Sequence, residues 1–191
     1  HANGYSLVRA LVAQWDLTLS EPYQARLRRT LGDAAADAAI AEAPHETLAT
    51  LGEVLLTPTR IYARAVLAVR EALTGAGHDI RGAAHITGGG LPGNVPRALP
   101  EALGARVDPS RWSTPSVERL FGALGGLDDA ELRATFNGGL GMVLVVPPAA
   151  ISPALRVLET HGIPAAVVGE VVETDALDGA RYAEASLESV A

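Results

Sequence analysis

The sequence contains no lysine and no cysteine, and each absence excludes whole classes of chemistry. All 15 basic residues among the 191 are arginines. Without lysine there is no phosphate-loop (Walker) lysine, no Schiff-base lysine and no lysine general base. Without cysteine there is no thiol nucleophile, no disulfide and no thiolate metal site. A side-chain cation that binds an anion here must therefore be an arginine or a histidine.

The sequence also has no excess of basic residues and no long apolar run. The net charge is −7 at pH 7, which disfavours nucleic acid or an anionic membrane as the main partner, because both attract basic surfaces. The longest apolar run, 144–151, is far shorter than the roughly 20 residues of a membrane span. With 48% hydrophobic residues, residues 1–191 are expected to form a single domain. The chain lacks an initiator Met, so we expect a piece of a longer protein.

Helical and strand-like patterns alternate along the chain without a regular repeat. This predicts an α+β fold, with a mixed, mostly antiparallel sheet and helices packed on it. The segment 142–146 is apolar at every position and predicts a central strand. Asp128 and Glu131 have the charge placement of a helix start. Helices are expected at 3–15, 57–73, 128–135 and 152–161, with another that opens at 113–115 and short ones in 20–50. Further strands are expected at 81–87, 105–108, 165–172 (buried) and 181–187.

The segment "HITGGGLPGNVPRALP", residues 85–100, places three consecutive glycines behind a predicted strand. It contains G-x-G-x-x-G, the pattern of dinucleotide-binding proteins, which requires a long helix directly after the glycines. Three prolines in the same segment fall where the first turns of that helix would run, and each interior proline costs about 3 kcal/mol. The dinucleotide-binding interpretation is therefore rejected.

A glycine loop followed by at most one or two helical turns remains. The consecutive Gly88, Gly89 and Gly90 would let backbone N–H groups converge on an anion without Cβ atoms in the way. Asn94 and Arg97 are close enough in sequence to add an amide and a guanidinium. The alternative is a tight strand exit at which another backbone packs closely.

A second glycine cluster, "TFNGGLGM" at 135–142, begins the predicted central strand. Gly138, Gly139 and Gly141 weaken the strand end unless a ligand or a neighbouring strand must approach it. Asn137 could donate and accept hydrogen bonds at the same place. Two strand ends without side chains favour a cleft more than either does alone.

Few titratable residues are candidates for a site. His85 faces the core by strand alternation and is interpreted as a buried, hydrogen-bonded histidine. Arg60 is a surface residue or an anion ligand. No histidine or carboxylate spacing indicates a self-contained metal site, and none is predicted. From the residues alone, the chain is a domain for a phosphorylated ligand.

Four segments occur together and in a fixed order: "HANGYSLVR" (1–9), "LLTPTRIY" (55–62), the glycine segment 85–100 and "FNGGLGM" (136–142). In combination they resemble the C-terminal half of the phosphoribosylformylglycinamidine cyclo-ligase family, also called aminoimidazole ribonucleotide synthetases. The resemblance covers nearly the whole chain and is weakest at 20–50. Its implied fold is the sheet-and-helix domain that closes the family's active-site cleft.

The resemblance implies a function in de novo purine biosynthesis. Enzymes of this family use ATP and Mg²⁺ to close the imidazole ring of formylglycinamidine ribonucleotide, giving aminoimidazole ribonucleotide, ADP and phosphate. They are cytoplasmic homodimers, and the N-terminal half forms the dimer core and holds most ATP and metal ligands. That half is absent from this chain, which is therefore expected to be inactive alone. The expected partner is a small phosphorylated substrate, with no nucleic acid and no membrane.

The resemblance also assigns residues. His1 and Asn3 match the family's first motif and are expected to be catalytic. Glu118 stands where the family commonly has an aromatic residue, and is interpreted as altered packing. The expected substrate- and phosphate-binding residues are Gly88, Gly89, Gly90, Asn94, Asn137 and Gly139 by position in the motifs, with Arg97 and Arg60 added from their own chemistry.

Two other classes of function stay open at this point. One is a paralogous ATP-dependent enzyme of the same architecture that acts on another substrate. The other is a non-catalytic binding domain.

Overall fold

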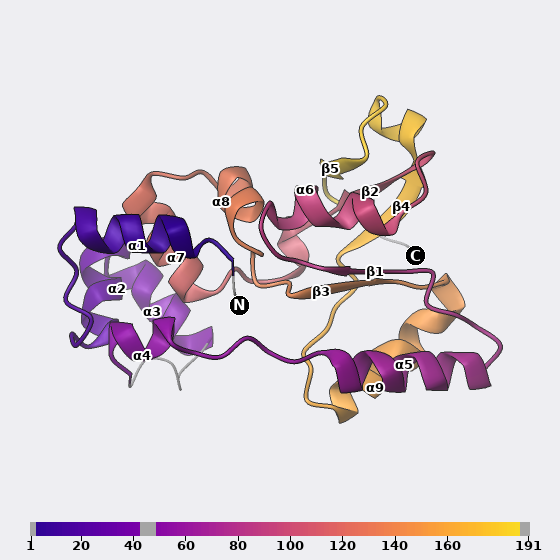
Figure 1. The fold of residues 1–191 in the computed structure, drawn as a ribbon, viewed down its shortest axis with the longest axis horizontal. Helices are drawn as coiled ribbons and strands as arrows, with labels where there is room; N and C mark the ends of the chain where they lie inside the picture. Colours follow the sequence, from indigo (N-terminus) through magenta and orange to yellow (C-terminus); the bar gives the residue numbers. More distant parts are fainter. Residues whose placement is uncertain (1–2, 43–48, 188–191) are drawn as a thin grey trace. The chain divides into compact units, whose positions relative to one another are not determined.

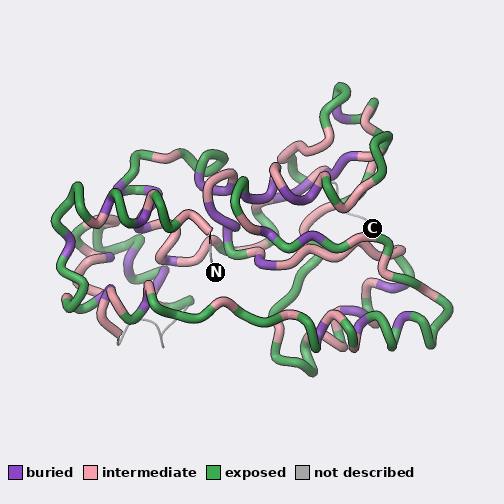
Figure 2. The backbone as a smooth tube through the Cα atoms, viewed as in Figure 1, coloured by how far each residue is buried: buried purple, intermediate pink, exposed green. Residues whose placement is uncertain are grey.

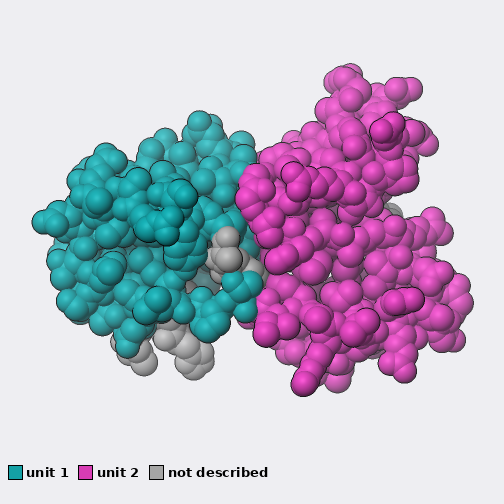
Figure 3. All heavy atoms as spheres, viewed as in Figure 1, with its two compact units in different colours: residues 1–59, 114–139 teal, residues 60–113, 140–191 magenta. Residues whose placement is uncertain are grey.

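The computed structural model describes residues 3–42 and 49–187, which form two compact units (Figure 1). Unit 1 comprises His1–Thr59 and Thr114–Gly139, and unit 2 comprises Arg60–Ser113 and Leu140–Ala191; Figure 3 colours the two. Each unit has its own buried residues (Figure 2). In the described ranges, no helix is long and apolar enough to cross a membrane.

The described part of unit 1 is helical. Its core is built around Tyr23, Leu27 and Phe121, none of which is exposed to solvent. In the helix that carries Phe121, the buried residues Leu120, Phe121 and Leu124 recur at helical spacing, so that one face of the helix turns inward. The helices are α1 (Tyr5–Gln14), α2 (Tyr23–Leu31), α3 (Asp33–Glu42), α4 (Leu51–Leu55), α7 (Ser116–Gly125) and α8 (Asp129–Thr135).

Helix α8 starts where the acidic residues predict a helix start, and its first turn is closed by a capping box. The Glu131 backbone N–H donates to Asp128 Oδ1 at 2.8 Å, and the Asp128 N–H donates to Glu131 Oε2 at 3.0 Å. Two backbone donors that the helix leaves unpaired are thereby satisfied. This cap fixes the first residue of α8. The helix ends at Thr135, directly before Phe136 and Asn137.

Unit 2 contains two small sheets, so the α+β class is confirmed. The predicted single sheet is in fact divided: β1 pairs with β3, and β2 pairs with β4 and β5. The β1–β3 and β2–β4 pairs are antiparallel, and β2–β5 is parallel. Its elements are α5 (Ala63–Gly75), β1 (Gly82–His85), α6 (Gly90–Asn94), η2 (Val95–Ala98), β2 (Leu103–Val107), η3 (Pro109–Arg111), β3 (Met142–Val145), η4 (Pro148–Ala150), α9 (Ile151–Thr160), β4 (Gly169–Glu173), η5 (Thr174–Leu177) and β5 (Tyr182–Glu184).

The β1–β3 pair is covered on both faces. On one face, Ile86 and Val143 pack in a cluster with Leu91 of α6. On the other, Leu144 packs in a cluster with Val69 of α5 and with residues of α9. This explains why β3 is apolar at every position. The prediction that β3 is a central strand is wrong, because β3 pairs with β1 alone in a two-stranded sheet, whose faces are covered by helices (Figure 1).

Two burial predictions are also wrong. The strand expected to be buried at 165–172 is β4, an edge strand in which Glu170, Val171 and Glu173 are exposed. His85 lies at the end of β1 and is exposed, whereas its neighbours Ala84 and Ile86 are buried. The alternation along β1 was predicted correctly in period and incorrectly in phase, since a one-residue shift exchanges the two faces.

Candidate functional site

The glycine loop between β1 and α6 is open at its first residue. A Cβ built on Gly88 would meet nothing within 4 Å, and one on Gly89 would meet only the Cα of Gly93, at 3.6 Å. Gly89 and Gly90 have φ of 89° and 58°, a region that other residues rarely adopt. At Gly88 no second backbone packs closely, so the tight-exit alternative lacks the contact that it requires.

Two backbone donors of this loop face no acceptor. In the described part of the chain, the N–H groups of Gly88 and Gly89 have no hydrogen-bond partner, and both residues are exposed. The Gly90 N–H, in contrast, donates to Thr87 O at 3.0 Å. Adjacent free N–H groups without side chains in front of them form a concave site that suits an anion.

The Asn94 side chain binds the backbone of the glycine loop. Its side chain is 5% exposed, and Nδ2 donates to Gly90 O at 2.7 Å, to Gly88 O at 3.2 Å and to Thr87 O at 3.4 Å. The two amide hydrogens are thus shared among three carbonyls of the loop. Asn94 therefore shapes the loop directly; its contact with a substrate stays a prediction.

A short helical stretch follows the glycines, as predicted, and an arginine fixes its exit. Helix α6 has five residues and η2 has four. The Arg181 guanidinium donates to Pro96 O and Leu99 O, each at 2.7 Å, and to Pro100 O at 3.0 Å. Sequence reasoning missed Arg181, because nothing in its neighbourhood points to a segment about 80 residues away.

The two predicted arginine ligands differ in their surroundings. Arg97 lies in η2, directly after α6, and is exposed. Arg60 is exposed ahead of α5, which packs on the opposite face of the β1–β3 pair from α6. The structure thus places Arg97 next to the glycine loop in the fold and gives no such placement for Arg60.

The remaining predicted residues belong to unit 1, except that His1 lies outside the described residues. Asn3 precedes Gly4, which is packed so closely against Phe136 that a Cβ at Gly4 would overlap the ring. Asn137 follows Phe136 and is fully buried. Its Oδ1 accepts from the Gly139 N–H at 2.9 Å. Asn3 and Asn137 thus flank one contact, between Gly4 and Phe136.

Glu118 of α7 lies against the same turn. Burial raises the pKa of its carboxyl from 4.5 to about 7, while hydrogen bonds from the Gly138 and Gly139 backbone N–H groups act in the opposite direction. A carboxylate therefore occupies the anion position that these glycines offer. The interpretation of Glu118 as altered packing missed this role. The signal was present: Glu118 precedes the buried Phe121 by three positions, so both lie toward one side of α7.

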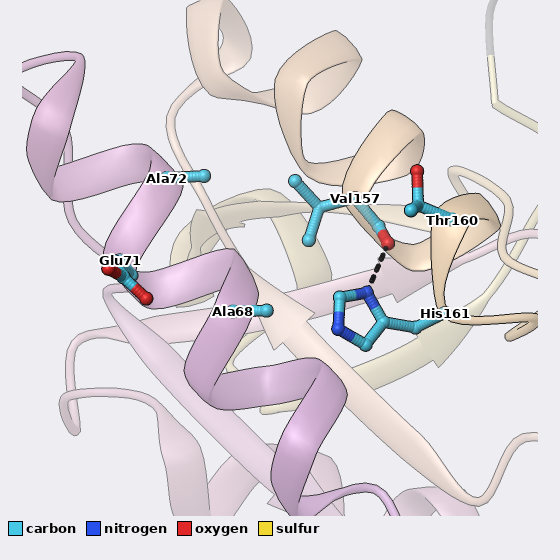
Figure 4. A pocket seen from close by; sticks show the side chains of 6 residues that line it. All are labelled: Ala68, Glu71, Ala72, Val157, Thr160 and His161. Atoms are coloured by element: carbon cyan, nitrogen blue, oxygen red, sulfur yellow. Dashed lines mark hydrogen bonds between the residues drawn. The ribbon is translucent and has the colours of Figure 1, made fainter.

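A groove between α5 and α9 of unit 2 has a volume of about 310 Å³. Figure 4 shows its lining, in which Val157 and the two alanines supply an apolar surface and Glu71 lies at the edge. The His161 ring is already engaged, with Nδ1 2.9 Å from Val157 O. None of the predicted site residues lines this groove, whose lining is Ala68, Glu71, Ala72, Val157, Thr160 and His161.

The chain is similar to known proteins over most of its length. A protein family described as "AIR synthase related protein, C-terminal domain" matches residues 1–180. A phosphoribosylformylglycinamidine cyclo-ligase of Sorangium cellulosum is 41% identical over 90% of this chain and 43% of its own length. Its counterpart in Geobacillus kaustophilus is 39% identical over 91% and 43%.

A longer relative shows the same similarity. The bifunctional purine biosynthetic protein PUR2,5 of Pichia angusta is 35% identical over 94% of this chain and 20% of its own length. The chain thus spans less than half the length of these curated relatives. The resemblance read from the four sequence motifs is confirmed, and the chain belongs to the family of AIR synthase related C-terminal domains.

Proposed function

We propose that the protein containing this chain is an ATP-dependent cyclo-ligase of purine biosynthesis. It would close the imidazole ring of formylglycinamidine ribonucleotide to give aminoimidazole ribonucleotide, ADP and phosphate. The observation that carries this proposal is the similarity over about 90% of the chain to relatives that are named phosphoribosylformylglycinamidine cyclo-ligase. The cytoplasm as location and a homodimer as assembly, formed through a region outside this chain, are parts of the same proposal.

In this proposal the glycine loop of unit 2 binds the phosphate of the substrate. The free N–H groups of Gly88 and Gly89 support it, because they face solvent with no Cβ in front of them. Arg97, exposed in the next helical stretch, adds a cation that keeps its charge at every relevant pH. Asn94 and Arg181 hold the loop in shape. Binding of this kind relies on backbone donors and arginine, and so it needs no lysine.

ATP and Mg²⁺ are proposed to bind mainly outside this chain. Among the described residues, no group of three histidine, aspartate or glutamate side chains could hold a metal ion. We therefore assign no Mg²⁺ ligand here. What this chain supplies is the positioning of the substrate and, through His1 and Asn3, catalytic groups at the start of unit 1. Positioning of bound reactants is itself a major source of rate enhancement.

The test is a cyclisation assay on the full gene product that contains this chain. Formylglycinamidine ribonucleotide, ATP and Mg²⁺ are supplied, and aminoimidazole ribonucleotide and ADP are measured. Equal amounts of both products are expected from the full protein, and none from residues 1–191 alone. If a folded full protein forms neither product, the proposal fails, and a paralogous enzyme with another substrate takes its place.

A further inference from the structure

The outer edge of β4 in unit 2 carries unpaired backbone groups. Just before this strand, the Asp108 N–H donates to Val168 O at 2.8 Å, and just after it the Thr174 N–H donates to Ala102 O at 3.0 Å. In an antiparallel pair, every second residue bonds to the neighbouring strand, and the residues between them direct their N–H and C=O groups the other way. The residues of β4 whose backbone groups point away from β2 are therefore Gly169, Val171 and Glu173.

No strand covers this edge. The order of the sheet is β4–β2–β5, so β4 and β5 lie on opposite sides of β2 (Figure 1). In the part of the chain that the structure describes, β4 pairs with β2 alone, and the three outward N–H groups have no hydrogen-bond partner. A row of unpaired backbone groups at a sheet edge is a template for one more strand.

The side chains along the edge indicate which strand fits. Val171 is 37% exposed and lies opposite the buried Ala105 of β2, so it is on the face of the sheet that packs in the core. Gly169 and Glu173 share that face, because they are two positions away on either side. Glu170 lies on the other face, where its Oε1 is 2.7 Å from Arg106 Nη1. The edge thus has a valine in the middle, with a glycine before it and a glutamate after it.

This arrangement is complementary to itself. When a second copy adds its β4 antiparallel, centred on Val171, each outward N–H meets an outward C=O. The two Val171 side chains are then neighbours on one face, and each Glu173 lies opposite the Gly169 of the other copy, so no two carboxylates are directly opposite. The two Glu170 side chains are diagonal neighbours on the other face, where each already has its own arginine.

We propose that the β4 edge of unit 2, Gly169–Glu173, is an interface at which two copies of this chain pair antiparallel about Val171. Because so short an edge makes a small interface, the dimer is expected to dissociate readily, with a dissociation constant of about 0.1–1 mM. The inference does not rest on the proposed function. The homodimer of that proposal forms outside this chain, so the β4 contact would join one such dimer to another.

The test is sedimentation equilibrium of this chain from about 10 µM to about 1 mM. We expect a monomer at the lowest concentrations and a reversible dimer at the highest. NMR over the same range locates the contact. The amide signals of Gly169, Val171 and Glu173 should shift with the fraction of dimer, whereas those of Glu170 and Val172, whose N–H groups already bond to β2, should shift less.

Two variants at the centre of the edge are informative. Val171→Lys places two like charges side by side and should weaken association at least about tenfold. Val171→Pro should have the same effect because it removes the central N–H, and the β2–β4 bonds remain because they do not use this group. Val167→Lys is the matched control: Val167 is also 37% exposed, but it lies outside β4. The control should associate as the wild type does.

Four results would overturn the inference. One is a folded chain that stays monomeric over the whole range. Another is association that both Val171 variants leave unchanged, which would place the contact elsewhere. A third is equal weakening by Val167→Lys, because added charge and not the strand edge would then be responsible. The fourth is a monomeric chain whose three edge signals shift only when an extended basic peptide is added, since the edge would then bind another protein.

Discussion

Replacing Glu118 by glutamine should change how the stability of unit 1 depends on pH. The carboxyl has a pKa of about 7 in the folded chain against an ordinary value of 4.5. The folded state therefore binds this proton more tightly than the unfolded state does, by about 3 kcal/mol. Because the folded pKa is raised, this stability is fully present below pH 4.5 and is lost as the pH rises to about 7.

The expected magnitude follows from the same shift. At pH 4.5 the wild type and Glu118→Gln should be similarly stable, because a protonated glutamate and a glutamine are nearly equivalent. At pH 8 the wild type must keep an ionised carboxylate buried, and the variant does not. The variant should then be more stable by about 2–3 kcal/mol. The gain should appear between pH 4.5 and 7.

The assay is urea denaturation at several pH values, followed by the fluorescence of Trp15. This side chain belongs to unit 1, and its Nε1 donates to Leu124 O at 3.0 Å. The other tryptophan, Trp112, belongs to unit 2. The wild-type background and every variant in this assay therefore carry Trp112→Phe, so that the signal comes from Trp15 alone. Glu131→Gln controls for the loss of one negative charge. If the stability difference between Glu118→Gln and wild type is constant from pH 4.5 to 8, the carboxyl titrates normally and the argument is refuted.

Further predictions concern the glycine loop of unit 2. Asn94→Ala removes an amide shared by three loop carbonyls, so we expect unit 2 to lose about 1–3 kcal/mol of unfolding free energy in thermal denaturation; an unchanged midpoint would contradict this. Gly89→Val forces a branched side chain to a φ of 89° and should cost about 1–3 kcal/mol. Gly88→Ala, whose Cβ meets no atom, should stay within about 0.5 kcal/mol of wild type; equal losses at both positions would argue against the loop geometry. Arg181→Lys replaces a planar fork by a single ammonium, so amide hydrogen exchange should become faster across 96–103; unchanged exchange would show that Arg181 does not hold the loop exit.

Much of the fold followed from local patterns. Helix α1 was predicted at 3–15 and lies at Tyr5–Gln14, because its apolar residues recur at helical spacing. The start of α8 followed from Asp128 and Glu131, since a capping box is a contact between neighbours in sequence. The glycine segment was predicted to end in a short helical stretch, because prolines limit a helix within the segment itself.

The failures share a different cause. Whether β3 is central depends on which strands pair with it, and its one partner in the described residues is β1, about 60 residues earlier in the chain. The phase of β1, and with it the exposure of His85, depends on how helices pack on this pair. Arg181 donates hydrogen bonds to carbonyls about 80 residues away, and the sequence around Arg181 contains no pattern that predicts these bonds. The sequence pattern predicts whether an element is a helix or a strand. Which of its faces is buried depends on the segments that pack against it.

Glu118 shows how the two kinds of information combine in the candidate site. The motif "FNGGLGM" predicts that a ligand or a neighbouring strand approaches its glycines, and the structure places the Glu118 carboxyl group there from within the same unit. A phosphate at Gly138 and Gly139 would have to displace that carboxylate. The two glycine clusters therefore differ in what they can do. The Gly88 and Gly89 N–H groups have no hydrogen-bond partner among the described residues, whereas those of Gly138 and Gly139 already hold the Glu118 carboxyl group.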